Sequence, residues 1–130
     1  MQDASVPSVV AIVLNWCNED LTAACLRSVE MSTYPNLDIL VVDNGSPDGS
    51  GDRLRARFPS CAYLQTGSNL GYAGGNNRGI ELCLRSNPDY VLVLNNDMVE
   101  KLIMTMLETN YTVRGKIRDY FIDPTIENLE

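Results

Sequence analysis

Four short apolar runs recur along the first hundred positions of the chain, and each of them ends in polar residues. The first run, residues 9–14, is continuously apolar and rich in β-branched side chains, which is typical of a strand covered on both faces. Similar runs predict further strands over residues 37–42, 61–65 and 90–94. Because these runs are apolar rather than alternating, we expect a sheet that is buried on both sides.

Stretches with helical spacing separate the runs and predict three helices. The first would be capped by Asn18 and would carry Glu19 and Asp20 in its first turn, where acidic side chains suit the helix dipole. The second would be capped by Ser50 and stopped by Pro59, and the third would begin at about Ala73. The apolar positions expected to face the sheet are Leu21, Cys25 and Val29 in the first helix, Leu54 and Phe58 in the second, and Ile80, Cys83 and Leu84 in the third.

Strands that alternate with helices predict an α/β fold, here a three-layer αβα arrangement around a mostly parallel sheet. Right-handed crossover connections place the carboxyl ends of parallel strands at one edge of the sheet, where such folds bind their ligands. The polar residues that end the four runs should therefore meet at this edge: Asn15, then Asp43 and Asn44, then residues 65–69, and then Asn95, Asn96 and Asp97.

Length and charge narrow the possible functions. A chain of 130 residues suits a single domain. Ten Lys and Arg against seventeen Asp and Glu give a net charge of −7, which argues against a nucleic-acid partner because phosphates need a basic surface. The chain has no histidine, which excludes Ser-His-Asp and Cys-His catalysis and every zinc site with a histidine ligand.

The cysteines and the apolar runs bear on location. Cys17, Cys25, Cys61 and Cys83 form no CxxC pair, so we expect free, buried thiols in a reducing compartment. The longest apolar run is far shorter than the roughly 20 residues that span a membrane, and no basic leader precedes it. We therefore expect no transmembrane segment and a cytoplasmic location, with the inner face of the membrane as a second possibility.

Asp97 is the first candidate for chemistry. It ends a buried strand after two amides, and a carboxylate in this position can bind a hard divalent cation such as Mg²⁺ or Mn²⁺. The alternative is that Asp97 caps a helix over residues 98–108.

Asp43 is the second candidate. Its carboxylate could accept a hydrogen bond from the N–H group of a nucleobase, a contact that would fix the identity of the base. The alternative is an Asx-turn that supports Asn44 and Gly45.

The glycine-rich segment 69–79 is the third candidate. Its glycines allow a ligand to approach the backbone, and the helix that follows offers free N–H groups to an anion, with Arg78 as a further positive charge. The alternatives are glycines used only for tight helix packing and a solvated Arg78. The segment does not have the GxGxxG pattern of a dinucleotide site, and it follows the third strand rather than the first.

In this order and at these separations, residues 41–46, 69–79 and 94–97 resemble the family 2 glycosyltransferases of the GT-A fold, most closely their rhamnosyltransferase-like bacterial branches. The resemblance covers about residues 7–100. It implies a nucleotide-diphosphate sugar donor, either a UDP-sugar or a dTDP-sugar, and transfer to a glycan or lipid-linked acceptor with inversion. Its implied context is the biosynthesis of cell-surface polysaccharide.

The resemblance also implies roles for individual residues. Asp43 matches the aspartate that binds the uracil or thymine ring, and Asn15 matches the segment that lines the base and ribose. Asp97 matches the residue that holds Mn²⁺ or Mg²⁺ against the diphosphate, where the ion would offset charge on the leaving group. The other nucleotide-binding positions implied are Asn44, Asn69, Gly71, Asn77 and Asn96, the last standing where the family commonly has Asp.

The chain departs from the family after residue 100. The resemblance assigns residues 1–100 to the nucleotide-sugar-binding half of a GT-A domain, and the composition sets residues 101–130 apart as a helical or irregular segment. Family members continue for well over a hundred further residues, which hold the acceptor site and the general base, so we expect a truncated domain. Glu100, Glu108, Asp119 and Asp123 lie in no recognisable base motif, and no catalytic residue is assigned.

Two functions follow from these observations. The leading hypothesis is a metal-assisted glycosyltransferase or its donor-binding half, and the alternative is a catalytically incomplete nucleotide-binding or interaction module. A dinucleotide oxidoreductase is disfavoured because the glycines follow the wrong strand. A missing second half would expose apolar surface, so association into a homo-oligomer is also expected.

Overall fold

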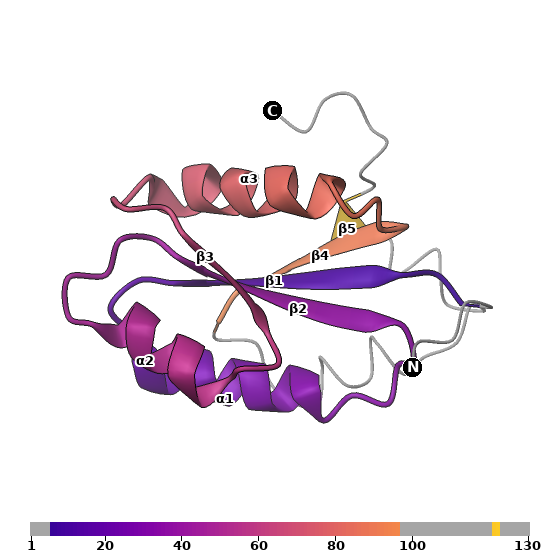
Figure 1. The fold of residues 1–130 in the computed structure, drawn as a ribbon, viewed down its shortest axis with the longest axis horizontal. Helices are drawn as coiled ribbons and strands as arrows, with labels where there is room; N and C mark the ends of the chain where they lie inside the picture. The colour runs from indigo at the N-terminus through magenta and orange to yellow at the C-terminus, as the bar shows by residue number, and fades with distance from the viewer. Residues whose placement is uncertain (1–5, 97–120, 123–130) are drawn as a thin grey trace.

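The computed structural model describes residues 6–96 and 121–122 of the chain. A five-stranded sheet lies at its centre, with the strand order β3-β2-β1-β4-β5 (Figure 1). The strands are β1 (Val9–Asn15), β2 (Leu37–Asp43), β3 (Ala62–Gln65), β4 (Tyr90–Leu94) and β5 (Phe121–Ile122). The first four are parallel, and β5 pairs antiparallel with β4. The predicted α/β fold with a mostly parallel sheet is therefore confirmed.

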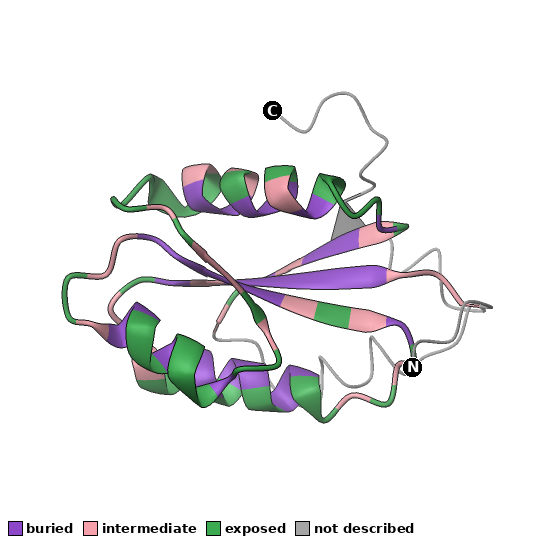
Figure 2. Cartoon of the chain, viewed as in Figure 1, coloured by how far each residue is buried: buried purple, intermediate pink, exposed green. Residues whose placement is uncertain are grey.

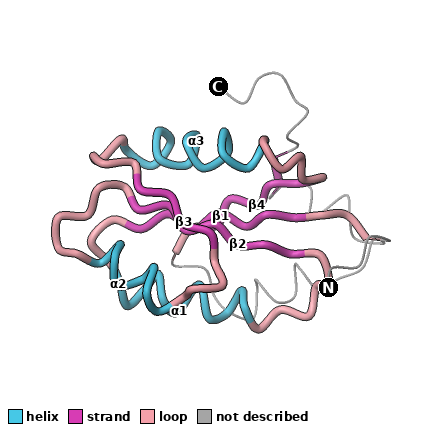
Figure 3. The backbone as a smooth tube through the Cα atoms, in the orientation of Figure 1, coloured by secondary structure: helices cyan, strands magenta, loops and turns pink. Residues whose placement is uncertain are grey.

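Three helices complete the layers: α1 (Glu19–Glu30), α2 (Ser50–Arg57) and α3 (Gly71–Leu84). Figures 1 and 3 show α1 and α2 together on one face of the sheet and α3 alone on the other. This arrangement follows from the parallel strands, because each crossover must carry its helix over a face of the sheet.

The core divides into two clusters because successive side chains of a strand point to opposite faces. On the α1 and α2 side, Ala11 and Val13 of β1 belong to a cluster that includes Leu26 and Leu54. On the α3 side, Ile12 of the same strand belongs to a cluster with Ile80. Figure 2 shows that β1, β4 and the second half of β2 are largely buried between helices whose outer surfaces are exposed, whereas the strand β3 has no buried residue.

The register brings the carboxyl ends of the strands to one edge. Asn15, the last residue of β1, pairs with Asp43, the last residue of β2. Asp43 in turn pairs with Gln65, the last residue of β3. In Figure 1 the loops that leave these strands lie together at the left of the sheet. The predicted meeting of the polar strand ends is confirmed for β1, β2 and β3.

Two glycines let the backbone of α3 approach the sheet closely. A Cβ atom on Gly79 would lie 2.9 Å from Cγ2 of Val42, and one on Gly75 would lie 2.7 Å from Cδ1 of Leu14. Both distances are shorter than real Cβ contacts allow. At these two positions the packing interpretation of the glycines holds, whereas Gly71 faces open space.

Some local predictions were wrong. Leu21 and Leu84 are exposed at 38% each, because the buried faces of their helices are set by other residues. In α1 these include Thr22, Ala23 and Leu26. α3 begins at Gly71 rather than Ala73.

The first turns of α1 and α2 also differ in detail from the prediction. Asn18 occupies the N-cap position of α1, but its side chain makes no capping hydrogen bond. Gly49, and not Ser50 as predicted, holds the N-cap position of α2, and the N–H group of Ser50 donates to Oδ1 of Asp48 at 2.9 Å.

The four cysteines are free, as predicted; Cys25 and Cys83 are buried, whereas Cys17 and Cys61 are half-buried. Burial raises the pKa of the Cys83 thiol to about 11. The short strand β5 was not anticipated from the sequence. The proposed helix over residues 98–108 lies outside the described residues. No helix in the described part of the chain is long and apolar enough to cross a membrane.

Candidate functional site

Asp43 lies at the centre of the polar edge. Its side chain has no exposed surface, and both of its oxygens accept hydrogen bonds. Oδ1 accepts from Nδ2 of Asn15 at 2.9 Å and from Oγ of Ser46 at 2.7 Å. Oδ2 accepts from the backbone N–H of Ser46 at 3.0 Å and from Nε2 of Gln65 at 2.8 Å. The bond to the Ser46 backbone is the turn-stabilising contact that was the alternative interpretation of Asp43.

These contacts keep Asp43 ionised. Burial by itself would raise the pKa of the carboxyl group, but the hydrogen bonds from Asn15, Ser46 and Gln65 outweigh it and lower the pKa below its ordinary value. The edge therefore contains a buried negative charge that is surrounded by neutral donors.

Glycine makes this burial possible. A Cβ atom on Gly51, in the first turn of α2, would lie 2.6 Å from Oδ2 and 2.8 Å from Oδ1 of Asp43. Gly45, in the turn after β2, has φ = 77° and lies against the backbone of Ser68. A larger residue at position 51 would push α2 away from the carboxylate, and one at position 45 would collide with the backbone of Ser68.

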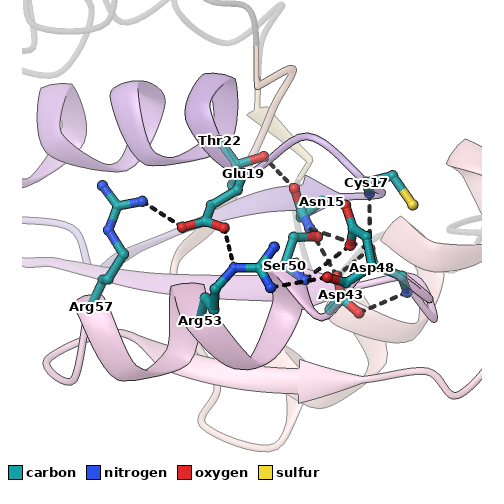
Figure 4. A network of polar contacts seen from close by, with 10 residues as sticks. Asn15, Cys17, Glu19, Thr22, Asp43, Asp48, Ser50, Arg53 and Arg57 are labelled. Atoms are coloured by element: carbon teal, nitrogen blue, oxygen red, sulfur yellow. Dashed lines mark hydrogen bonds and ion pairs between the residues drawn. The ribbon is translucent and has the colours of Figure 1, made fainter.

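Asn15 links Asp43 to the two helices α1 and α2. Its Nδ2 group also donates to Oγ of Ser50 at 2.9 Å, and its Oδ1 atom accepts from Oγ1 of Thr22 at 2.7 Å. Asn15, Thr22 and Ser50 have no exposed surface. Figure 4 shows these side chains converging from the end of β1 and the first turns of both helices. We call Asn15, Thr22, Asp43, Ser46 and Ser50 the edge network.

Sequence reasoning identified Asn15 and Asp43 and placed residues 65–69, which include Gln65, at this edge, but it missed Thr22, Ser46 and Ser50 as members of the edge network. Thr22 was detectable, since it stands four residues before Leu26 on the inward face of α1, where a polar side chain needs a buried partner. Ser46 and Ser50 carry no comparable signal, because serine is ordinary in turns and at the starts of helices.

Asn44 fastens the loop that follows β3. Its Nδ2 group donates to the carbonyl oxygen of Gly71 at 3.0 Å and to Oδ1 of Asn69 at 3.2 Å. Its Oδ1 atom accepts from Oγ1 of Thr66 at 3.0 Å and from the N–H of Leu70 at 3.2 Å. Three predicted positions, Asn44, Asn69 and Gly71, therefore form one connected unit.

The N-terminal part of α3 differs from the edge network because its polar groups are less fully paired within the protein. α1 carries Glu19 and Asp20 in its first turn and α2 carries Asp52, whereas the first turn of α3 has no acidic residue. Asn77 is half-buried in this helix, and its side chain has no hydrogen-bond partner among the described residues. The positive end of the α3 dipole is thus left uncompensated by acidic side chains.

Trp16 is a further candidate that sequence reasoning did not single out. It directly follows Asn15 at the end of β1, and 47% of its surface is exposed. An exposed indole beside a polar edge offers a flat apolar face on which a nucleobase can stack.

Asn96 is the part of the predicted acidic motif that the structure describes. It is half-buried after β4, and its Nδ2 group donates to Oγ1 of Thr22 at 3.1 Å. Asp97, the predicted metal ligand, lies outside the described residues. Within the described part of the chain no three acidic, Cys or His side chains gather as a metal site. Oxygen donors such as Asn96 and Asp97 nevertheless suit Mn²⁺ or Mg²⁺, which often use one or two carboxylates together with substrate phosphates.

A cavity of about 190 Å³ lies beside this edge, between β3 and α3. Arg78 and Arg85 line it from α3, and Gln65 and Thr66 line it from the end of β3. Ligand pockets usually enclose about 300–1,000 Å³, so this cavity is too small to hold a whole nucleotide sugar.

Comparison with known proteins agrees with this architecture. The sequence model of the family described as Glycosyl transferase family 2 matches residues 8–126. The match extends into the segment after residue 100, which the composition had set apart.

Two curated relatives are also glycosyltransferases. The low-salt glycan biosynthesis hexosyltransferase Agl10 of Haloferax volcanii is 35% identical over 131 residues, which is 100% of this chain and 40% of that protein. The N-acetylglucosaminyl-diphospho-decaprenol L-rhamnosyltransferase of Mycobacterium tuberculosis is 40% identical over 55 residues, which is 42% of this chain and 18% of that protein. The chain thus spans less than half the length of both relatives.

Solved structures share the fold at lower identity. The mannosyltransferase PcManGT of Pyrobaculum calidifontis, solved with GDP-Man and Mn²⁺, has a TM-score of 0.62 at 20% identity, covering 78% of this chain and 32% of that one. Glucosyl-3-phosphoglycerate synthase of Mycobacterium tuberculosis, solved with Mn²⁺, UDP-Glc and phosphoglyceric acid, has a TM-score of 0.57 at 15% identity, covering 74% and 35%. With the family match spanning most of its length, this chain belongs to glycosyl transferase family 2.

Proposed function

We propose that the chain binds a nucleotide-diphosphate sugar at the carboxyl edge of its sheet and acts as the donor-binding part of a glycosyltransferase. The observation that carries the proposal is the convergence of Asn15, Asp43 and Asn44 at this edge, next to a helix start without acidic residues. A diphosphate is an anion, and the free N–H groups and dipole of a helix N-terminus favour anions.

Within this site we assign the base to the ends of β1 and β2. Trp16 would stack on one face of a uracil or thymine ring. Direct contact between Asp43 and the base stays a prediction, because both carboxylate oxygens already accept hydrogen bonds. Such a contact requires Gln65, an exposed side chain, to leave Oδ2. Asn69, Gly71 and Asn77 would lie beside the ribose and the diphosphate.

We assign the metal to the end of β4. Asp97 would hold Mn²⁺ or Mg²⁺, with Asn96 beside it. The ion would supply positive charge that stabilises the leaving nucleoside diphosphate. The structures solved with Mn²⁺ together with GDP-Man or UDP-Glc support this assignment, since the chain shares their fold. Inversion and a cytoplasmic location stay predictions.

Calorimetric titration of the chain with UDP, dTDP, GDP and CDP, each with and without Mn²⁺, tests the proposal. We expect one uridine or thymidine diphosphate to bind more tightly with Mn²⁺, and Asp97→Ala to remove the metal dependence. Asp38→Ala is the matched control, since Asp38 is an exposed carboxylate at the opposite end of β2. A folded wild-type chain that binds none of the nucleotides under either condition would refute the proposal.

A second candidate is a nucleotide-binding or interaction module without turnover. It is favoured by one observation, that the chain covers only 40% of the Haloferax hexosyltransferase. Incubation with UDP-glucose or dTDP-rhamnose and light scattering separate the two candidates. Release of nucleoside diphosphate supports the enzyme, whereas a stable homo-oligomer that binds but does not turn over supports the module.

A further inference from the structure

A chain of hydrogen bonds crosses the polar edge from β4 to β3. Nδ2 of Asn96 donates to Oγ1 of Thr22 at 3.1 Å, and this hydroxyl donates to Oδ1 of Asn15 at 2.7 Å. Nδ2 of Asn15 then donates to Oδ1 of Asp43 at 2.9 Å. From the other side, Nε2 of Gln65 donates to Oδ2 of Asp43 at 2.8 Å. In this series of hydrogen bonds, every donor points toward the ionised carboxylate of Asp43.

Among the described residues, Thr22 is the one side chain that links Asn96, after β4, to Asn15 and Asp43 through hydrogen bonds. Its hydroxyl has a single proton, which it gives to Asn15, so it can only accept from Asn96. The proton also fixes the orientation of the Asn15 amide, whose Nδ2 must then face Asp43 and Ser50. Hydrogen bonds arranged head to tail in a buried place polarise and strengthen one another.

The contacts of Thr22 differ from those of an ordinary helical hydroxyl. Thr and Ser side chains inside a helix commonly bond back to the carbonyl four residues earlier. Ser28, on the same helix, does so, donating to the carbonyl oxygen of Ala24 at 3.0 Å. Thr22 reaches out of the helix to two other elements, although it is as buried as any residue in the core.

We propose that Thr22 is a positioning residue that couples the metal-binding end of β4 to the nucleobase end of the site. The inference rests on the proposed function, because it takes Asn96 to lie beside the bound metal and Asp43 and its neighbours to lie beside the base. Loss of the hydroxyl would free Asn96 on one side and the Asn15 amide on the other. The part of nucleotide affinity that depends on metal would then fall.

The test measures the affinity of the full chain for UDP, or for whichever nucleotide binds best, with and without Mn²⁺. The readout is the dissociation constant without Mn²⁺ divided by the dissociation constant with Mn²⁺, which measures how much the metal tightens binding. We expect Thr22→Val, which keeps the shape and removes the hydroxyl, to lower this ratio by about fivefold, the loss of one net hydrogen bond. Thr22→Ser should restore the ratio, and Ser28→Ala, which removes a hydroxyl bonded only within α1, should leave it unchanged.

The outcomes are distinguishable. A wild-type chain that binds no nucleotide refutes the proposed function together with this inference. A wild-type chain that binds nucleotide without any effect of Mn²⁺ overturns the metal assignment and the coupling with it, but leaves the proposed nucleotide binding in place. A folded Thr22→Val protein with the wild-type ratio also overturns the coupling.

Asn96→Ala removes the hydrogen bond between Asn96 and Thr22 by changing its half-buried partner. This variant therefore tests the proposal even if Thr22→Val does not fold. The proposal expects the same fall in the ratio for Asn96→Ala, and no further fall when the two substitutions are combined. An Asn96→Ala protein that keeps the wild-type ratio, or a double variant that loses the sum of both effects, contradicts the role assigned to Thr22.

Discussion

The edge network and the start of α3 lie at the same end of the sheet, but their polar groups are used in opposite ways. In the edge network the side chains are buried apart from the half-buried Ser46, and Asp43 accepts hydrogen bonds at both oxygens. At the start of α3 the residues are mostly exposed, Gly71 faces open space, and Asn77 has no partner in the described part of the chain.

This difference separates residues that stabilise the fold from residues that can contact a ligand. Buried polar groups that satisfy one another hold the strand ends in a fixed arrangement, because leaving any of them unpaired is unfavourable. Groups without internal partners are the ones available to a ligand. The comparison therefore assigns stability mainly to the edge network and ligand affinity mainly to α3, and the following substitutions test that division.

Asp43→Ala should have the largest effect. It removes the acceptor of four donated hydrogen bonds and leaves buried donors without partners. We expect the free energy of unfolding to fall by about 3 kcal/mol or more, measured by urea denaturation. Asp38→Ala in the same strand should change it by less than about 0.5 kcal/mol. Equal effects of the two substitutions would show that the edge network does not support the fold.

Gly51→Ala should come next. Alanine normally favours a helix over glycine, but its Cβ atom would lie 2.6 Å from Oδ2 of Asp43. We expect a loss of about 1–3 kcal/mol in unfolding free energy from the forced shift. Asp52→Ala, at the next and exposed position of α2, is the control. A stabilised Gly51→Ala protein would mean that α2 can move away from the carboxylate without loss.

Low pH should reduce the contribution of Asp43 to the stability of the fold. The pKa of Asp43 is lower in the folded chain than in the unfolded one, where it is about 3.9. Its stabilising contribution is therefore complete above about pH 4 and is lost as the pH falls through the folded-state value. Glu19 and Asp48 have lowered pKa values as well. Thermal unfolding of Asp43→Asn beside the wild type isolates the share of Asp43, and identical acid profiles would contradict it.

Asn77→Ala tests the other side of the comparison. Because this side chain has no partner among the described residues, its removal should leave the melting temperature unchanged. If the amide contacts the nucleotide, the affinity for UDP should fall by about 1 kcal/mol, or roughly fivefold. Glu81→Ala, at an exposed position one turn later in α3, should alter neither quantity. A lower melting temperature with unchanged affinity would place Asn77 among the supporting residues.

Glu19→Gln should have the smallest effect. Glu19 binds Arg53 at 2.5 Å and Arg57 at 2.8 Å, and it ties α1 to α2 (Figure 4). Both arginines are substantially exposed, and exposed ion pairs contribute little. We expect no measurable change in urea denaturation at physiological salt. A clear loss would mean that the ion pair, and not the edge network alone, holds the two helices together.

The fold could be predicted from the sequence to a large extent. The four strands were placed within one residue at either end, because continuous β-branched runs and the glycine and proline turns between them are local signals. The exposed positions of Leu21 and Leu84 could not, since helical spacing gives a stripe but not its centre. The pairing of β5 with β4 joins segments about thirty residues apart, so no local sequence pattern predicts it.

The sequence by itself determined the alternation of strands and helices, the edge at which the polar strand ends meet, and the presence of Asn15, Asp43 and Asn44 at that edge. Only the tertiary structure decided how those residues are used. It showed that Asp43 accepts hydrogen bonds from Ser46 and Gln65 as well as Asn15, that Gly51 makes room for it, and that Thr22 joins Asn96, after β4, to the network. The reason is physical: side-chain hydrogen bonds depend on distances of about 3 Å between residues far apart in the chain, and the chain acquires those distances only when the sheet and helices pack.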